Sequence, residues 1–247
     1  MNTIKKIKED YEVLLRSVPA MVTTSFILSV VFMNLFAGKE LLRTEYLCLN
    51  SGLLLSWISF LCMDCICKRF GPKAATKISV LAMGVNVICS IIFWLMSLIP
   101  GRWAAYYSAT EASTGELINA GLDSTFAGAW YIVLGSCTAM FLSTLVNSGL
   151  NAFIGKRADN GKFLGFIARS LPSTCIAQFV DNLVFSAMVS HVFFGWNWKQ
   201  VVICSFTSMI FELVMEAVFS PVGYRISKKW EKKNIGQPYL EMIGNAA

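Results

Sequence analysis

The chain has 247 residues, of which 55% are hydrophobic and 15% are charged, and its formal net charge is +6. Soluble globular domains carry about 25% charged residues. The mean hydropathy of +0.59 therefore excludes an ordinary soluble domain and predicts an integral membrane protein.

Apolar runs long enough to cross a bilayer recur along the chain. A transmembrane helix needs about 20 consecutive, mostly apolar residues. We therefore predict an all-α, polytopic membrane protein with six transmembrane helices in a single transmembrane domain over residues 1–247. The predicted spans are 18–37, 49–67, 78–99, 126–150, 171–194 and 201–222.

The segment before the first span, KKIKEDYEVLLRS, has the pattern of a short amphipathic helix at a membrane surface. The apolar run after it is too long for a typical signal peptide and lacks a small-residue cleavage pattern, so we interpret it as a retained helix. This span contains Asn34, a candidate binding residue, and Lys39 follows its end. Lys39 is a candidate for gating or coupling, although a lysine there can also simply snorkel to the membrane surface.

The second span ends in SFLCMDCICKRFG, which places Asp64 and Lys68 four residues apart on one helical face. The pair is either an interfacial ion pair or part of a site, with Asp64 binding and Lys68 gating. Cys62 and Cys65 have C-x-x-C spacing, but we favour ordinary apolar packing because no second such pair accompanies them and the chain has one histidine. We predict no metal site and no cofactor.

A long loop over residues 100–125 follows the third span and is predicted to lie outside the cytoplasm, as an interfacial helix or a lid. It divides the spans into two sets of three, which must run through the membrane in opposite directions. Two sets of three spans with opposite orientation are typical of the inverted repeats of secondary transporters. We therefore consider two inverted three-helix halves as a possible organisation of the chain.

The basic residues indicate an orientation in the membrane. Of the 21 lysines and arginines, all except Lys39, Arg43, Arg102 and Lys199 fall in segments that a six-span chain exposes on one side. Basic residues accumulate on the cytoplasmic side of membranes. We therefore predict both termini in the cytoplasm. The sequence has no outer-membrane strand pattern, so we expect the protein in the cytoplasmic (inner) membrane. Because the positive charge is divided among several separate segments, no nucleic-acid partner is predicted.

The fifth span carries Asp181 near its midpoint. A charge there costs roughly 2.5–3.5 kcal/mol on insertion scales, and such residues are usually functional. Gln178 and Phe185 share the helical face of Asp181, and Asn182 flanks it. We predict that these residues form a wall of a substrate pocket. The alternative is a buried polar contact that locks helices together.

The sixth span carries Glu212 near its midpoint and Glu216 one turn further along the same face. Two neighbouring carboxylates repel each other, and at least one pKa rises where solvation is poor. The pair therefore suits a bound cation or a proton-coupling step. The chain contains no H-E-x-x-H, G-x-S-x-G or P-loop pattern, so we predict that it is not an enzyme.

The polar residues occur in four segments that together resemble the VUT family of bacterial queuosine-precursor transporters. The segments are NLFAGK, FLCMDCICKRFG, ARSLPSTCIAQFVDNLVF and FELVMEAVFSPVGY. One element of the resemblance consists of Asp64, Lys68, Phe70 and Gly71, and another of Arg169, Ser173, Gln178 and Asp181. Length and six-span layout also agree, so the resemblance covers nearly the whole chain.

The resemblance implies import of a 7-deazaguanine base or queuine through the lipid bilayer, for salvage into modified tRNA. It implies that Asp181 or Asp64 accepts the adjacent N–H donors of a guanine-like edge, that Gln178 or Asn34 contacts its carbonyl, and that Arg169 is a gating candidate. The chain departs from the family at Glu212, where members often carry lysine. We therefore expect it to favour a cationic precursor.

Two other classes stay open. One is a substrate-binding membrane subunit of an energy-coupling-factor type vitamin importer, which needs separate ATPase subunits. The other is a membrane enzyme, which the missing nucleophile–base pair disfavours. A homodimer is compatible with the transporter interpretations.

Overall fold

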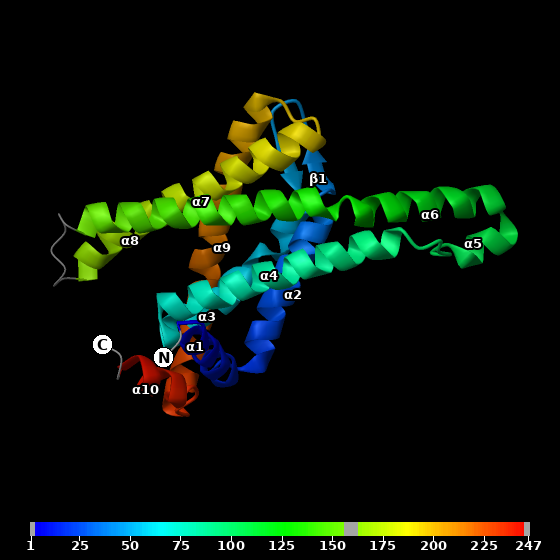
Figure 1. Cartoon of the computed structure of the whole chain (residues 1–247). Coiled ribbons are helices and arrows are strands. Elements are labelled where there is room, and N and C mark those ends of the chain that lie inside the picture. The colour runs from blue at the N-terminus through cyan, green and yellow to red at the C-terminus, as the bar shows by residue number, and fades with distance from the viewer. Residues whose placement is uncertain (1–2, 156–162, 245–247) are drawn as a thin grey trace. The chain divides into compact units, whose positions relative to one another are not determined.

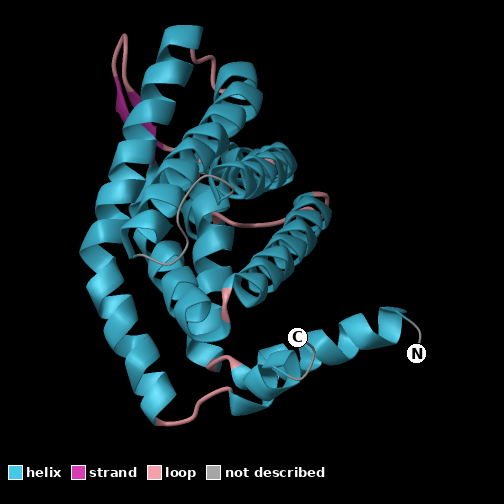
Figure 2. Cartoon of the chain, turned by 90° about the vertical axis from the view of Figure 1, so that its left-hand side faces the viewer, coloured by secondary structure: helices cyan, strands magenta, loops and turns pink. Residues whose placement is uncertain are grey.

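The computed structural model describes residues 3–155 and 163–244, and nearly all of these residues are helical (Figures 1 and 2). The all-α prediction fits, apart from one short β-hairpin. The helices are α1 (Thr3–Ser17), α2 (Ala20–Phe36), α3 (Ser56–Phe70), α4 (Pro72–Ser97), α5 (Ala105–Thr110), α6 (Ala112–Ala127), α7 (Ala129–Gly155), α8 (Phe163–Phe185), α9 (Trp198–Lys232) and α10 (Gln237–Gly244). The remaining elements are strands β1 (Glu40–Arg43) and β2 (Cys48–Asn50), the 3-10 turn η1 (Ser51–Leu55) and the π-helical turn η2 (Ser186–His191).

Four helical stretches of the described chain are long and apolar enough to cross a membrane: Ser51–Phe70, Pro72–Ser97, Ala112–Asn147 and Trp198–Lys232. A fifth is counted if α1 and α2, which meet at a bend of 106°, form one broken span. The predicted span 171–194 is helical as α8 and η2 but does not belong to this set. The protein is therefore polytopic, and six spans stays a prediction.

Three expected boundaries differ from the structure. Residues 49 and 50 belong to strand β2 and not to a transmembrane helix, because they pair with β1. The predicted loop 100–125 is mostly helical, as α5 and α6. The last span extends ten residues past its predicted end at 222, to Lys232, and Pro221 lies inside it without ending it.

The contacts divide the chain into two compact units, each built from separate stretches of sequence. Unit 1 consists of Met1–Met33, Leu54–Asn86 and Val214–Ala247, and unit 2 of Asn34–Leu53 and Val87–Leu213. Both units therefore combine residues from the early and the late part of the chain. Their boundaries do not fall at the loop 100–125, so an arrangement in two inverted halves also stays a prediction.

Unit 1 has an apolar core that joins α1, α2, α3, α4, α9 and α10. Leu14 of α1, Ile66 of α3 and Ile78 of α4 are fully buried in one cluster with Trp230 of α9 and Tyr239 of α10. Gly71 ends α3 with a φ of 86°, its N–H donates to Cys67 O, and Pro72 begins α4. Glycine tolerates this left-handed conformation and proline suits the first turn of a helix, which explains the sharp corner between the two helices. Cys62 and Cys65 are buried in this core as free thiols, which confirms their interpretation as apolar packing residues.

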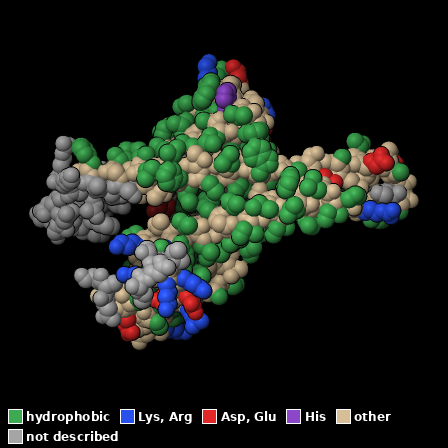
Figure 3. Space-filling model, in the orientation of Figure 1, with side chains coloured by type: hydrophobic (Ala, Val, Ile, Leu, Met, Phe, Trp, Pro, Cys, Tyr) green, Lys and Arg blue, Asp and Glu red, His purple; other side chains and the backbone are tan. Residues whose placement is uncertain are grey.

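Unit 2 is organised around α7 and α8, which run side by side (Figure 1). Apolar side chains cover much of the surface of the long helices, whereas charged side chains gather near α1 and α10 and at the tip of α5 and α6 (Figure 3). A lipid-facing helix needs such an apolar surface because the hydrocarbon core offers no polar partners.

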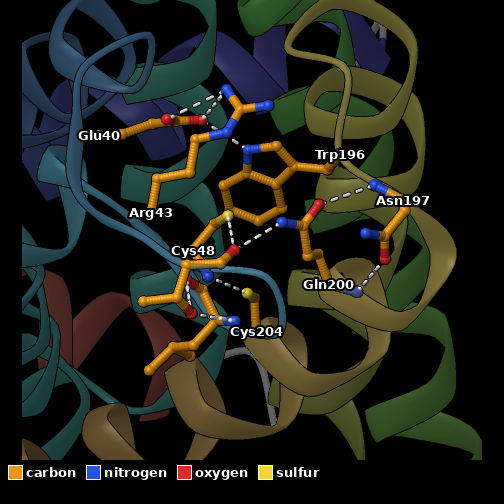
Figure 4. A network of polar contacts seen from close by, with 9 residues as sticks. Glu40, Arg43, Cys48, Trp196, Asn197, Gln200 and Cys204 are labelled. Carbon is orange, nitrogen blue, oxygen red and sulfur yellow. Dashed lines mark hydrogen bonds and ion pairs between the residues drawn. The ribbon is translucent and has the colours of Figure 1, made fainter.

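Strands β1 and β2 pair antiparallel and are tied to the start of α9 by polar contacts (Figure 4). Trp196 Nε1 donates to Glu40 Oε1 at 2.7 Å, and Gln200 Nε2 donates to Thr44 O at 2.9 Å. The N–H of Cys48 donates to Sγ of Cys204 at 2.9 Å. Burial raises the pKa of the Cys48 thiol, and the nearby Glu40 adds to this effect. The thiol therefore stays neutral and serves as a packing group.

Candidate functional site

Three helices of unit 2 bring together an acidic cluster, defined here as Ser143, Gln178, Asp181, Asn182 and Glu212. Ser143 Oγ of α7 donates to Asp181 Oδ1 of α8 at 2.9 Å. Nδ2 of Asn182 donates both to Gln178 O and to Glu212 Oε2 of α9, each at 3.0 Å. The polar groups of the fifth and sixth predicted spans thus meet through the Asn182 amide.

Helical periodicity explains the part of this cluster that comes from α8. Gln178, Asp181 and Asn182 lie within about one turn of each other, so their side chains leave the helix on one side. The packing of α7 along α8 then brings Ser143 to the carboxylate of Asp181. All five residues of the cluster are partly buried. The acidic cluster thus combines two acidic side chains with an amide inside an apolar helical unit.

The hydrogen bonds of the acidic cluster leave it able to accept further donors. Ser143 occupies Oδ1 of Asp181, and the carboxylate has a second oxygen. Oε2 of Glu212 accepts from Asn182. Two carboxylates can together accept up to about eight hydrogen bonds when ionised. A ligand with adjacent N–H groups, or with a positive charge, fits this chemistry.

Phe185 lies one turn after Asp181 on α8, as predicted, but it packs against an apolar cluster. That cluster contains the buried Ala37, Ile132 and Val189. The structure therefore gives Phe185 a packing contact, and a stacking role toward a ligand stays a prediction.

A second group, the lysine cluster, joins α3 and α9 in unit 1 and consists of Asp64, Lys68 and Ser220. Nζ of Lys68 lies 2.6 Å from Asp64 Oδ2 and donates to Ser220 Oγ at 2.9 Å and to Ser220 O at 3.3 Å. Gly223 provides the space: a Cβ there would sit 2.5 Å from Asp64 Oδ2. The predicted ion pair is thus formed, and it fastens two helices together.

The remaining predicted site residues are Asn34, Lys39, Glu216 and Arg169. Asn34 is buried in α2, and Lys39 is exposed in the turn before β1. Glu216 lies one turn beyond Glu212 on α9 and belongs to unit 1. The side chain of Arg169 lies outside the described residues.

One serine of these clusters, Ser143, was not predicted from the sequence. Serines are frequent in the apolar helices of this chain, and a serine becomes notable only when the register between two helices is known. Among the described residues, no group of three or more His, Cys, Asp or Glu side chains could hold a metal ion.

Comparison with known families gives a match over most of the chain. A family model described as "Putative vitamin uptake transporter" matches residues 50–226, which is well over half of the chain. The matched range contains every member of the acidic and the lysine cluster, whereas Asn34 and Lys39 precede it. Neither the curated proteins nor the solved structures gave a match.

Proposed function

The chain belongs to the vitamin uptake transporter family, and from this premise we propose that it is a transporter that imports queuosine precursors for tRNA modification salvage. The proposed substrates are 7-deazaguanine bases or queuine. The proposed location is the cytoplasmic membrane of a bacterium.

The observation that carries this proposal is the acidic cluster. A guanine-like edge presents adjacent N–H donors, and one carboxylate can accept both at once. Asp181 has an oxygen beyond the one that Ser143 occupies, and the amides of Gln178 and Asn182 lie on the same helix turn. This set of acceptors and amide groups matches both the donor edge and the carbonyl of the base.

Energetics favour a ligand role for Asp181 over a purely structural one. A carboxylate inside an apolar helical bundle is costly, roughly 2.5–3.5 kcal/mol at the centre of a membrane. Among the described residues, its hydrogen-bond donor is the neutral hydroxyl of Ser143, which cannot balance a charge. A polar contact that only locked helices together would be cheaper with a neutral side chain. The position is therefore better explained by a substrate that supplies donors.

Glu212 suggests which precursor is preferred. It adds a second carboxylate to the cluster, at a position where family members often carry lysine. A cationic substrate, such as the aminomethyl base or queuine, gains attraction from two carboxylates that the neutral nitrile base does not. We expect Glu212→Lys to lower uptake of the cationic bases relative to the nitrile base, in competition assays with all three. Unchanged relative uptake would show that Glu212 does not set the preference.

The deciding experiment measures queuosine in tRNA of a host that can neither make nor import the precursors. The host expresses the wild type, Asp181→Ala or the control Asp123→Ala at matched membrane levels. Asp123 lies on α6, is partly buried and accepts from Trp103 Nε1, and it is not a member of the acidic cluster. Rescue by the wild type and by Asp123→Ala, with loss in Asp181→Ala, supports the proposal.

Two other outcomes would change the proposed function. Rescue by Asp181→Ala would return this residue to a structural role while keeping the transporter. Absence of rescue by the wild type would point to another substrate or to a missing energising partner. Copurification with ATPase subunits, and failure of the purified chain to transport alone in liposomes, would then favour a substrate-binding subunit of an energy-coupling-factor type importer.

A further inference from the structure

The helix that carries Asp181 changes its hydrogen-bonding pattern shortly after the acidic cluster. Helix α8 ends at Phe185, and Ser186–His191 continue as the π-helical turn η2. A π-helix bonds residue i to residue i+5, so each hydrogen bond spans one residue more than in an α-helix. Such turns are rare and occur frequently at functional sites, because the extra residue can be passed along the helix.

Close packing against α7 holds this turn in place. Val189 is fully buried, and a Cβ added to Gly135 of α7 would lie 2.3 Å from its Cγ2. Glycine at 135 is thus required for the present position of Val189. Ser190 is also fully buried, and among the described residues its hydroxyl has no hydrogen-bond partner. A buried hydroxyl without a partner is costly, so this arrangement is poised to be exchanged for another.

The residues after the turn form an aromatic cluster with the start of α7, namely Trp130, Tyr131, Phe193 and Phe194. The rings of Tyr131 and Phe193 are stacked, with centroids 4.1 Å apart and planes at 16°. Trp130 meets Phe193 edge-on at 6.3 Å, and Phe194 meets Tyr131 edge-on at 6.2 Å. Because about 1.5 Å of helix separates successive residues, this cluster lies on the order of 18 Å along the helix from Asp181.

The order along α8 is therefore acidic cluster, π-helical turn, aromatic cluster. We propose that η2 is the hinge of an aromatic gate, closed by the Tyr131–Phe193 stack, that controls access to the acidic cluster. Converting the turn to α-helical bonding moves the residues after it by one position, a rotation of about 100°. Phe193 then leaves Tyr131, and the end of the α7–α8 pair opens. This mechanism rests on the proposed transport function.

The first test needs no substrate. Hydrogen–deuterium exchange is followed in the full-length protein in detergent for wild type, Gly135→Ala and Gly149→Ala. Gly149 lies on the same helix, and a Cβ there meets nothing within 4 Å. Gly135→Ala displaces Val189 from the closed arrangement, so amides 186–194 should exchange about tenfold faster or more, while those of α6 stay unchanged. Val189→Ala in the Gly135→Ala background restores the space and should restore slow exchange.

Equal exchange of residues 186–194 in Gly135→Ala and Gly149→Ala would overturn the hinge. The gate is tested separately with Tyr131→Cys/Phe193→Cys, joined by a short, reductively cleavable bis-maleimide in a background without the native cysteines. We expect uptake into liposomes to fall at least tenfold on cross-linking and to return after cleavage. Uptake by each single variant should not change when the reagent is added. Undiminished uptake by the cross-linked protein would overturn the gate.

The two proposals fail in different ways. If the uncross-linked protein takes up none of the three precursor bases, the proposed substrate is wrong. The exchange experiment then still decides whether η2 moves as a unit, because it uses no substrate.

Discussion

Ser143 shows how a neutral residue on one helix can set the behaviour of a charged residue on another. Its hydroxyl donates to Oδ1 of Asp181, which fixes the plane of the carboxylate and directs the second oxygen away from the bond. The position of the acceptor for a ligand thus depends on a residue of α7. We regard Ser143 as a positioning residue of the acidic cluster.

We predict that Ser143→Ala weakens binding of the precursor base. A hydrogen bond to a charged group contributes about 1.5–3 kcal/mol, so the dissociation constant should rise roughly tenfold or more. Ser143→Thr keeps the hydroxyl and should bind nearly as well as the wild type. The control is Thr138→Ala on the same helix, whose hydroxyl donates only to Leu134 O. Isothermal titration in detergent gives the affinities, and equal losses for residues 143 and 138 would contradict the positioning role.

Gly223 allows a second prediction at this scale, which concerns stability. A Cβ there would press on Oδ2 of Asp64 and displace it from Lys68. We expect Gly223→Ala to lower the free energy of unfolding by about 1–3 kcal/mol, the usual range for overpacking. Gly84→Ala on α4 meets nothing within 4 Å and should be neutral or slightly stabilising, since alanine favours helix. Thermal unfolding of both variants in one detergent makes the comparison.

Among the elements, the β-hairpin was the one that the sequence did not predict. Residues 40–50 interrupt two apolar runs, and their pairing depends on contacts with residues 196–204 that lie far along the chain. Trp196 is buried and donates to Glu40, so the hairpin and the start of α9 hold each other in place.

We predict that Trp196→Phe destabilises the protein more than Trp103→Phe. Both tryptophans donate from Nε1 to a carboxylate, at 2.7 Å to Glu40 and at 2.8 Å to Asp123. Only Trp196 is buried, so its loss leaves a poorly solvated acceptor, at a cost of about 1–3 kcal/mol. The exposed pair should contribute well under 1 kcal/mol. Equal shifts of the thermal midpoint would show that burial does not distinguish the two bonds.

The elements also show how much could be foreseen from sequence. Hydropathy located the long helices, and helical periodicity placed Gln178, Asp181 and Asn182 on one face, because both depend on residues close in sequence. Ser143 and the turn η2 could not be foreseen in this way. The first depends on the register between α7 and α8, and the second on a choice among main-chain hydrogen bonds that side-chain patterns do not encode.

At the scale of the whole molecule, charge and apolar surface describe a polytopic membrane protein. The helices expose large apolar side chains over most of their length, and the apolar stretches are long enough to span a bilayer. The number of spans decides whether the two termini lie on the same side. An even number, combined with the asymmetry of lysine and arginine, predicts that both lie in the cytoplasm.

We predict that reporter proteins fused to either end of the chain will indicate that both ends lie in the cytoplasm. Green fluorescent protein should fluoresce at both termini, and alkaline phosphatase should be inactive at both. A phosphatase inserted between Gly101 and Arg102, in the predicted outer loop, should be active and serves as the positive control. Opposite behaviour of the two termini would indicate an odd number of spans.

The contacts between distant parts of the sequence also determine when the protein can finish folding. Gln200 and Cys204 bond to Thr44 and Cys48 across 156 positions, and Lys68 bonds to Ser220 across 152. A ribosome adds about 5–20 residues per second, so the early partners wait roughly 8–30 s for the late ones. Until then both units are incomplete, with strand edges and charges inside the membrane still lacking their partners. Translation that stops before residue 200 leaves neither unit complete, because both units take residues from α9.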